Sequence, residues 1–281
     1  MLTTAADVTR GQPAPDYALG YSDAEQDRLI RQAALIAPYT ERLFREAGIG
    51  PGHRVLDLGS GMGDVSMLAA GLVGTSGEVV GIERDAASIE RAQARVATAG
   101  LRNVSFLETD VDNIVIDQPF DAAVGRLILM FLPDPVAALR SLSRLVRPGG
   151  VLAFLEPSWT PTLALLAPLF LWSATASIVH KTFLGTGANP EMGPELYHLF
   201  EEAGLPAPTM RMEMLLGKEP DLAQWFYDVI CSLRPKMEQL HLPIESLGSL
   251  DTLVGRLQAE AAGSRAVGCL IAVVGAWSRQ P

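Results

Sequence analysis

The sequence predicts an α/β fold in which helices cover both faces of a doubly wound, mostly parallel sheet. Strand-like and helix-like segments alternate between residues 54 and 156, which is typical of parallel sheets. A glycine-rich turn joins the first of these strands to its helix. Of the 281 residues, 48% are hydrophobic and 19% are charged, and this composition supports a large buried core.

The first half of the chain supplies most of the predicted elements. Residues 22–47 are predicted to form an amphipathic helix, and Ser22 with Glu25 makes a capping box at its start. The strands that follow are predicted at 54–59, 78–83, 104–109, 120–126 and 150–156, with helices between them at 64–72, 86–99 and 134–146.

The second half departs from this alternation at two predicted cap insertions, near residues 157–190 and 219–265. The first begins with a charge-free stretch, 157–179, which is long enough to span a bilayer. Because that stretch contains Pro161 and Pro168 and lies between strands of one sheet, we expect an apolar cap and no stable membrane insertion. The remaining elements are a helix at 193–205, a strand at 209–217, helices within 219–265 interrupted by Pro235 and Pro243, and a strand at 266–277.

Composition narrows the class of function. The net charge of −10 argues against a nucleic-acid partner, because phosphates would be repelled. The two cysteines, Cys231 and Cys269, form neither a disulfide framework nor a metal-binding spacing, and no metal site is predicted. The first twenty residues lack the apolar core of a secretory signal. These features predict a cytoplasmic, acidic protein that acts on a small molecule.

The glycine-rich turn between Asp57 and Gly63 is the most informative motif. Glycines at 59, 61 and 63 let the backbone turn tightly and approach a ligand closely. A dinucleotide-binding fingerprint would need its third glycine at position 64, which is Asp64. An acidic side chain there is a poor neighbour for a pyrophosphate, so the turn suits a ligand with a cationic amino-acid part.

This Asp-x-Gly-x-Gly-x-Gly pattern resembles motif I of class I S-adenosylmethionine-dependent methyltransferases, in their bacterial small-molecule, ubiquinone-biosynthesis-like branch. The resemblance implies a seven-stranded, Rossmann-like methyltransferase sheet. It also implies that Gly59, Ser60, Gly61 and Gly63 line the methionine part of S-adenosyl-L-methionine. Asp57 would orient the turn and bind the amino group of the cofactor, and S-adenosyl-L-homocysteine would be the product.

Acidic side chains at the ends of the next two strands fit the same cofactor. Glu83 ends its strand and has a carboxylate that can accept both ribose hydroxyls. The same placement serves NAD, and an ion pair with Arg84 or Arg91 is the alternative for Glu83. Arg84 is itself included in the predicted cofactor site.

By the same resemblance, Asp110 after the third strand binds the adenine amino group, and Val111 lies beside the ring. Asp112 is the rival for this role, and a turn-forming aspartate is the alternative for both acids.

Two further segments resemble the family. Residues 120–135 resemble motif IV but lack the Asn-Pro-Pro-Tyr sequence of nucleic-acid enzymes, which also argues against a nucleic-acid substrate. Arg126 in this segment would bind the cofactor carboxylate or, alternatively, pair with Asp121 at the surface. Residues 1–48 resemble a segment that covers the cofactor, with Tyr21 and Gln32 as contacts, while residues 49–281 form the core.

Methyl transfer is an in-line displacement that depends on orientation, and a phenol, carboxylate or enolate needs no strong base. For an alcohol or a carbon acid, the candidates for general base are His180 and Glu156.

The predicted caps carry many large apolar side chains, which suit a lipophilic acceptor or pack against one another or a dimer partner. These side chains are Trp159, Phe170, Trp172, Phe183, Met192, Trp225, Phe226 and Tyr227.

The predicted activity is therefore the O- or C-methylation of a small, lipophilic metabolite. One alternative is an enzyme of the same fold that binds the cofactor without methylating, as pericyclase-like relatives do. Another is an NAD-dependent oxidoreductase, which Asp64 and the lack of a Tyr-x-x-x-Lys pair disfavour. A non-enzymatic scaffold would leave the cofactor motifs without a purpose.

Overall fold

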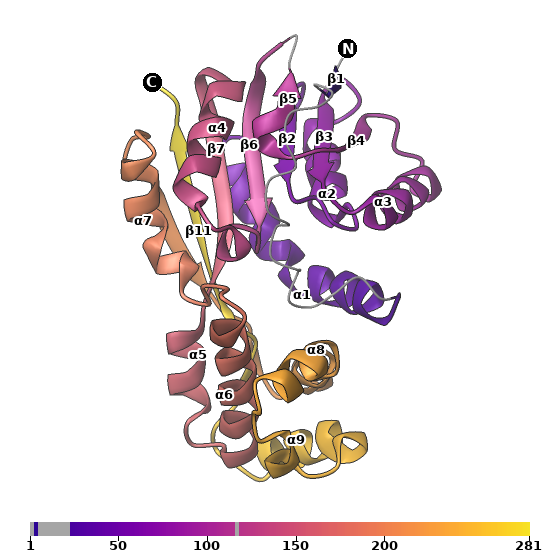
Figure 1. Ribbon diagram of the computed structural model, residues 1–281, viewed down its shortest axis with the longest axis vertical. Helices are drawn as coiled ribbons and strands as arrows, with labels where there is room; N and C mark the ends of the chain where they lie inside the picture. The colour runs from indigo at the N-terminus through magenta and orange to yellow at the C-terminus, as the bar shows by residue number, and fades with distance from the viewer. Residues whose placement is uncertain (1–2, 5–22, 116–117) are drawn as a thin grey trace.

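A seven-stranded sheet forms the centre of the computed structural model, which describes residues 3–4, 23–115 and 118–281 (Figure 1). The strands β4, β3, β2, β6 and β7 are parallel, and β11 is antiparallel to both of its neighbours, β7 and β8. The predicted doubly wound, mostly parallel sheet is therefore confirmed. In spatial order the strands are β4 (Val104–Glu108), β3 (Glu78–Glu83), β2 (Arg54–Leu58), β6 (Phe120–Arg126), β7 (Val146–Ser158), β11 (Ala272–Arg279) and β8 (Thr209–Glu213).

Helices cover both faces of this sheet. One face carries α1 (Asp23–Ala47), α2 (Asp64–Val73) and α3 (Ala86–Thr98), and the other carries α4 (Pro135–Leu145) and α7 (Met192–Glu202). The central strands are buried on both sides, so Val55 and Leu56 of β2 and Ala123 and Val124 of β6 are all 0% exposed. Near-continuous apolar strands of this kind are what a doubly covered parallel sheet requires.

The two insertions meet in one helical lobe at the end of the sheet where the parallel strands finish (Figure 1). The first insertion gives α5 (Trp159–Leu166) and α6 (Phe170–Gly185), and the second gives α8 (Pro220–Gln239) and α9 (Leu253–Ala262). The short elements are η1 (Val111–Asn113), η2 (Leu129–Phe131), η3 (Ile244–Leu247), η4 (Leu250–Thr252) and the antiparallel pairs of β1 (Thr3–Thr4) with β5 (Ile114–Val115) and β9 (Leu216–Gly217) with β10 (Gly268–Cys269).

The charge-free stretch 157–179 is divided between the end of β7, α5 and the first part of α6. In the part of the chain that the structure describes, no helix is both long and apolar enough to cross a bilayer. The predicted break at Pro235 is wrong, because this proline lies inside α8. Proline removes one backbone hydrogen bond, but Leu233 and Met237 on either side are 0% exposed, and their packing holds the last turn in place.

Aromatic side chains form the core of the lobe. Phe226 of α8 meets the rings of Trp172 and Trp225 at centroid distances of 5.5 and 4.9 Å, both near-perpendicular. The indole Nε1 of Trp172 donates to the carbonyl of Leu257 at 2.8 Å, which joins α6 to α9. The carboxylate of Glu260 accepts from the backbone N–H of Leu171 at 3.0 Å and so caps the start of α6.

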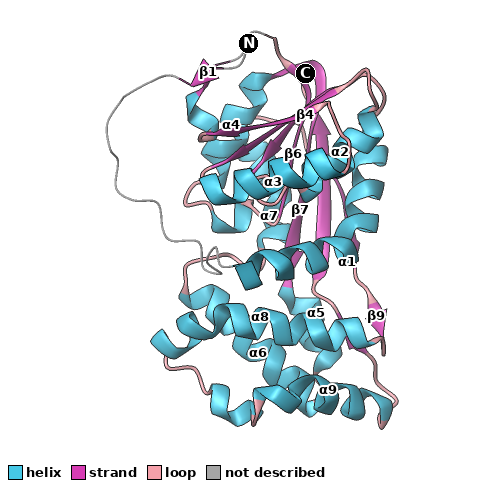
Figure 2. Ribbon diagram, turned by 90° about the vertical axis from the view of Figure 1, so that its right-hand side faces the viewer, coloured by secondary structure: helices cyan, strands magenta, loops and turns pink. Residues whose placement is uncertain are grey.

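The helix α1 lies between the sheet and α8 (Figure 2), and an ion pair connects the two helices. Asp228 of α8 is 8% exposed and accepts from Arg31 Nε of α1 at 2.8 Å. The other oxygen of Asp228 accepts from Gln224 Nε2 at 2.8 Å. The carboxylate therefore has partners from both helices, which fixes α1 against the lobe.

Replacing Asp228 with asparagine is expected to lower the free energy of unfolding by about 1 kcal/mol, because the buried partner of the ion pair loses its charge. The effect stays this small because Arg31, the other partner, is more than half exposed to water. Glu238→Gln is the matched control on the same helix, since its pair with Arg234 is exposed on both sides. The control should change the free energy by less than about 0.5 kcal/mol in urea unfolding. Equal effects of the two variants would contradict this role of Asp228.

Candidate active site

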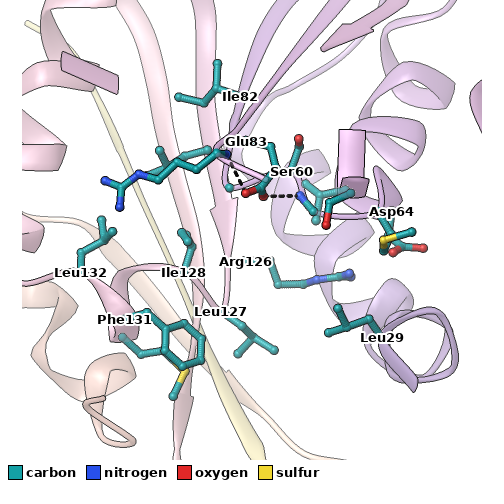
Figure 3. Close-up of a pocket in the computed structure, with 18 of the residues that line it drawn as sticks. Leu29, Ser60, Asp64, Ile82, Glu83, Arg126, Leu127, Ile128, Phe131 and Leu132 are labelled. Carbon is teal, nitrogen blue, oxygen red and sulfur yellow. Dashed lines mark hydrogen bonds between the residues drawn. The ribbon is translucent and has the colours of Figure 1, made fainter. Parts of the chain in front are cut away.

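A cavity of about 540 Å³ lies between the carboxyl ends of the strands and the helical lobe (Figure 3). One part of its wall, the glycine-loop half, comes from the ends of β2, β3 and β4, and it consists of Leu58–Met62, Asp64, Val65, Ile82–Arg84, Ser88 and Thr109–Val111. The other part, the lobe half, consists of Arg28, Leu29, Gln32, Leu127, Met130–Pro133, Pro157, Trp159, Phe183, Trp225, Val229 and Ile271; the cavity is also lined by Arg126, Ile128, Asp134, Ala137 and Ala138. Ligands of doubly wound sheets bind at this edge.

The glycine turn follows β2 in a left-handed conformation that only glycine adopts easily, with φ of 65° at Gly59 and 47° at Gly61. A Cβ on Gly59 would come within 2.6 Å of Ile128 Cδ1, whereas a Cβ on Gly61 would meet nothing within 4 Å. Both residues line the cavity, and the open side of Gly61 leaves room for a ligand against the backbone. Gly63 does not line the cavity, and its missing side chain makes room for Phe106 and Ala92.

Asp57 lies behind this turn and is 1% exposed. Its Oδ2 accepts from Ser66 Oγ at 2.6 Å, but its Oδ1 has no hydrogen-bond partner among the described residues. Burial raises the pKa of Asp57 from 3.8 to about 7. The Ser60 hydroxyl, in the cavity wall, is likewise buried without a partner. Asp57 itself does not line the cavity, so Ser60 is the orphaned group nearer to a ligand that brings hydrogen-bond donors, such as an ammonium group, with Asp57 behind it.

Glu83 at the end of β3 lines the cavity and holds the glycine turn. Its Oε2 accepts from the backbone N–H of Gly61 at 2.9 Å, and its Oε1 accepts from the N–H groups of Arg84 at 2.7 Å and Asp85 at 3.1 Å (Figure 3). The Arg84 guanidinium pairs with Asp110, not with Glu83. The predicted alternative of a Glu83–Arg84 ion pair is therefore wrong.

The end of β4 supplies the third acidic position. Asp110 and Val111 both line the cavity, and Asp110 Oδ1 accepts from the N–H of Val111 at 2.8 Å at the start of η1. The structure thus brings Asp110, Glu83 and the glycine turn to one wall. The side chain of Asp112 and the whole of Tyr21, which the sequence also suggested, lie outside the residues described.

Arg126 ends β6 and lines the cavity, where it extends toward the side on which Asp64 and Leu29 lie (Figure 3). Its Nη1 donates to Thr40 Oγ1 at 3.3 Å, and burial lowers the pKa of its guanidinium, against the attraction of Asp64 and Asp57. The predicted alternative of a surface pair with Asp121 is wrong. Asp121 instead accepts from Arg147 Nε and from the N–H of Arg54, both at 2.7 Å, so Arg126 keeps donors that a ligand could use.

Glu156 of β7 is 0% exposed and does not line the cavity. Its carboxylate accepts from the backbone N–H groups of Ile128 at 3.0 Å, Leu129 at 2.9 Å and Met130 at 3.3 Å. Burial raises the pKa of Glu156 to about 7, against the effect of these hydrogen bonds. The carboxylate therefore holds the segment after Leu127, whose φ of 53° is left-handed, and this segment forms part of the cavity wall.

His180 of α6 also lies behind the wall. Its ring centroid is 5.9 Å from that of Trp159, which lines the cavity where His180 does not. Burial lowers the pKa of His180, so its neutral form is favoured. Among the described residues, no group of three or more His, Cys, Asp and Glu side chains is placed to hold a metal ion.

The helix α1 contributes more to the cavity than the sequence indicated. Arg28, which is 2% exposed, and Gln32 line the wall together, and Arg28 Nη1 donates to Gln32 Oε1 at 2.7 Å. Sequence reasoning proposed Gln32 but missed Arg28. The signal was available in principle, because positions four apart share one helix face, and a buried arginine on such a face needs polar partners.

Comparisons with known proteins agree with this geometry. The profile of a family described as a methyltransferase domain matches residues 49–204. An uncharacterized protein of Mycobacterium tuberculosis is 35% identical over 135 residues, 48% of this chain and 47% of that protein. A ubiquinone/menaquinone biosynthesis C-methyltransferase of Coxiella burnetii is 36% identical over 121 residues, 42% of this chain and 48% of that enzyme. The chain thus spans about half the length of the curated relatives it matches.

Solved structures show the same fold at low identity. A putative methyltransferase of Bacillus halodurans has a TM-score of 0.56 at 15% identity, covering 86% of this chain and 98% of its own. The YcgJ protein of Bacillus subtilis has a TM-score of 0.56 at 16% identity, covering 86% of this chain and 99% of its own.

The family profile covers more than half of the chain, so this protein belongs to the methyltransferase-domain family. It is a class I S-adenosylmethionine-dependent methyltransferase, and S-adenosyl-L-methionine is the cofactor of that class. Membership favours this interpretation over an NAD-dependent oxidoreductase.

The raised pKa of Asp57 predicts how the stability of the cofactor-free protein depends on pH. Between pH 4 and 7 the folded chain keeps a proton that the unfolded chain releases, so the contribution of Asp57 to stability falls as the pH rises. Asp57→Asn cannot titrate, so its stability relative to the natural protein should improve by about 2–3 kcal/mol between pH 5 and pH 8. Urea unfolding at both pH values measures this, and a constant difference would contradict the assignment.

Proposed function

We propose that this protein transfers the methyl group of S-adenosyl-L-methionine to a small, lipophilic acceptor bound in the lobe half of the cavity. The observation that carries the proposal is that one cavity joins the glycine turn and its acidic side chains to an aromatic compartment. An in-line displacement requires both reactants in one water-poor space, held in a fixed orientation.

The residues of the glycine-loop half fit the cofactor, which supplies an electrophilic methyl group on a sulfonium. The orphaned Asp57 Oδ1 and Ser60 Oγ suit its ammonium group, directly or through a water molecule. Glu83 keeps acceptor capacity for one ribose hydroxyl, because a carboxylate has about four acceptor sites and Glu83 uses three of them on backbone N–H groups. Asp110 with Val111 would hold the adenine, and the spare donors of Arg126 would hold the carboxylate.

The lobe half favours a lipophilic acceptor. Its wall contains Trp159, Phe183, Trp225 and Phe131 together with aliphatic side chains, and Gln32 is the one side chain with an amide among them. Arg28, which donates to Gln32, is the ionisable side chain that this half contains in the described part of the chain. Apolar walls with few polar groups are typical of sites for lipophilic small molecules. The name of the Coxiella relative, a C-methyltransferase of ubiquinone/menaquinone biosynthesis, also supports carbon as the methylated atom.

The described lobe half contains no carboxylate or histidine that could act as a general base, and this also supports a methyl acceptor that ionises by itself. A phenol or a stabilised enolate would provide its own nucleophile, on oxygen or on carbon, without a protein base. Glu156 and His180 would then support the cavity wall and take no part in proton transfer. Glu156 fixes the wall segment that follows Leu127, and His180 supports the ring of Trp159 from behind.

Calorimetric titration with S-adenosylmethionine, S-adenosylhomocysteine and NAD tests the cofactor site. The natural protein should bind the two sulfur ligands and not NAD. Glu83→Gln should weaken their binding at least tenfold, because amides accept hydrogen bonds less strongly than carboxylates do.

Glu78→Gln is the matched control, since Glu78 begins the same strand and pairs with Arg54 at the opposite end. The control should bind like the natural protein. Folded natural protein that binds neither sulfur ligand would contradict the proposed function.

A further inference from the structure

Gln32 is held by two donors from opposite sides of the cavity wall. Its Oε1 accepts from Arg28 Nη1 at 2.7 Å on α1 and from Trp225 Nε1 at 2.8 Å on α8. A side-chain carbonyl oxygen has two acceptor sites, so both are used. The indole and the guanidinium can only donate, and this fixes which end of the Gln32 amide faces them.

The amide nitrogen Nε2 is therefore the polar atom that Gln32 has left to offer. It donates to no described residue, while the residue lines the cavity. Leu29 and Val229, which line the same wall, present hydrocarbon, and the indole N–H of Trp225 is already used by Gln32. The indole of Trp159 and the guanidinium of Arg28, which also line the cavity, can only donate, so none of these neighbours offers an acceptor to Gln32 Nε2. A donor whose orientation is fixed by its neighbours, in a wall that supplies it with no acceptor, favours a ligand with an oxygen atom at this point.

We propose that Gln32 is a specificity-determining residue whose Nε2 binds an oxygen atom of the methyl acceptor. This inference rests on the proposed function and narrows the acceptor to an apolar molecule with a carbonyl, phenolate or enolate oxygen. Because Gln32 offers a hydrogen-bond donor at this point and no hydrogen-bond acceptor, a substrate that carries an ammonium or other cationic group is disfavoured. The contact also ties substrate recognition to the α1–α8 junction, because Trp225 belongs to the lobe and Gln32 to the N-terminal helix.

The alternative role for Gln32 is a contact with the cofactor, which its resemblance to a covering segment implied. The two roles differ in which ligand, the methyl acceptor or the cofactor, binds more weakly when the donor is removed. Gln32→Glu removes the N–H groups and keeps two carboxylate oxygens for Arg28 and Trp225, so the junction retains its hydrogen bonds. Gln32→Met, of similar length, serves as a second variant that adds no charge; it removes the donor together with the oxygen that accepts from Arg28 and Trp225, so Gln32→Glu controls for the loss of those two bonds.

The test compares two probes that differ by one hydroxyl group, 2-naphthol and naphthalene, on protein saturated with S-adenosylhomocysteine. Quenching of tryptophan emission reports their binding, because Trp159 and Trp225 line the cavity. The natural protein should bind 2-naphthol about fivefold more tightly than naphthalene, the effect of one hydrogen bond. Both variants should lose this preference while their affinity for naphthalene and for S-adenosylhomocysteine changes less than twofold.

Each other outcome has a definite meaning. Equal affinity of the natural protein for the two probes, or a preference that survives in both variants, would overturn the role of Gln32. Weaker binding of S-adenosylhomocysteine by both variants, with the probe preference intact, would assign Gln32 to the cofactor instead. Natural protein that fails to bind S-adenosylhomocysteine, or that binds neither probe, would overturn the proposed function itself, which is a separate result.

Discussion

The buried carboxylate of Asp57 is the constraint on which the glycine-loop half of the site depends. Asp57 lies in β2 between β3 and β6, opposite Gly81 and Val124, and has almost no access to water. Ser66 of α2 satisfies one of its oxygens and so fixes the helix to the strand across the glycine turn. The second oxygen stays without a partner, at a cost of about 1–3 kcal/mol. The fold therefore keeps an acceptor that a cationic ligand group would satisfy, at the point where the backbone opens toward the cavity.

Glu156 is a second buried acid, and the comparison with Asp57 shows how partners decide the role of a carboxylate. Three backbone N–H groups hold the carboxylate of Glu156 behind the cavity wall, so it fixes a turn and does not face the cavity. Asp57 has a single described donor and keeps one oxygen free. One acid thus shapes the wall that adjoins the lobe half, while the other prepares the glycine-loop half for a ligand.

The parts of the site that sequence reasoning predicted are local. The spacing from Asp57 to Gly63 and the acids at the ends of β3 and β4 are set by single strand–turn units, so the sequence alone placed Glu83 and Asp110 on one edge. Contacts between distant segments could not be predicted in this way. The partner of Asp121 is Arg147 because β6 and β7 pair, and the helix continues through Pro235 because the lobe packs around it.

The same limit applies to the wall of the lobe half. Nothing in the sequence near Glu156 indicates that its carboxylate binds the backbone N–H groups that follow Leu127. The first of these belongs to Ile128, twenty-eight residues before Glu156. Likewise, the bond between Gln32 and Trp225 joins residues 193 positions apart. The first contact follows from the pairing of β6 with β7 and the second from the packing of α8 on α1, and local patterns encode neither.

The most direct test of the account is a crystal structure of the protein with S-adenosylhomocysteine. The account predicts the ligand against Gly59 and Gly61, with a ribose hydroxyl on Glu83 and its sulfur facing the aromatic wall formed by Trp159 and Trp225. A ligand bound elsewhere, or bound with its sulfur turned away from the lobe half, would contradict the central claim that one cavity brings cofactor and acceptor together.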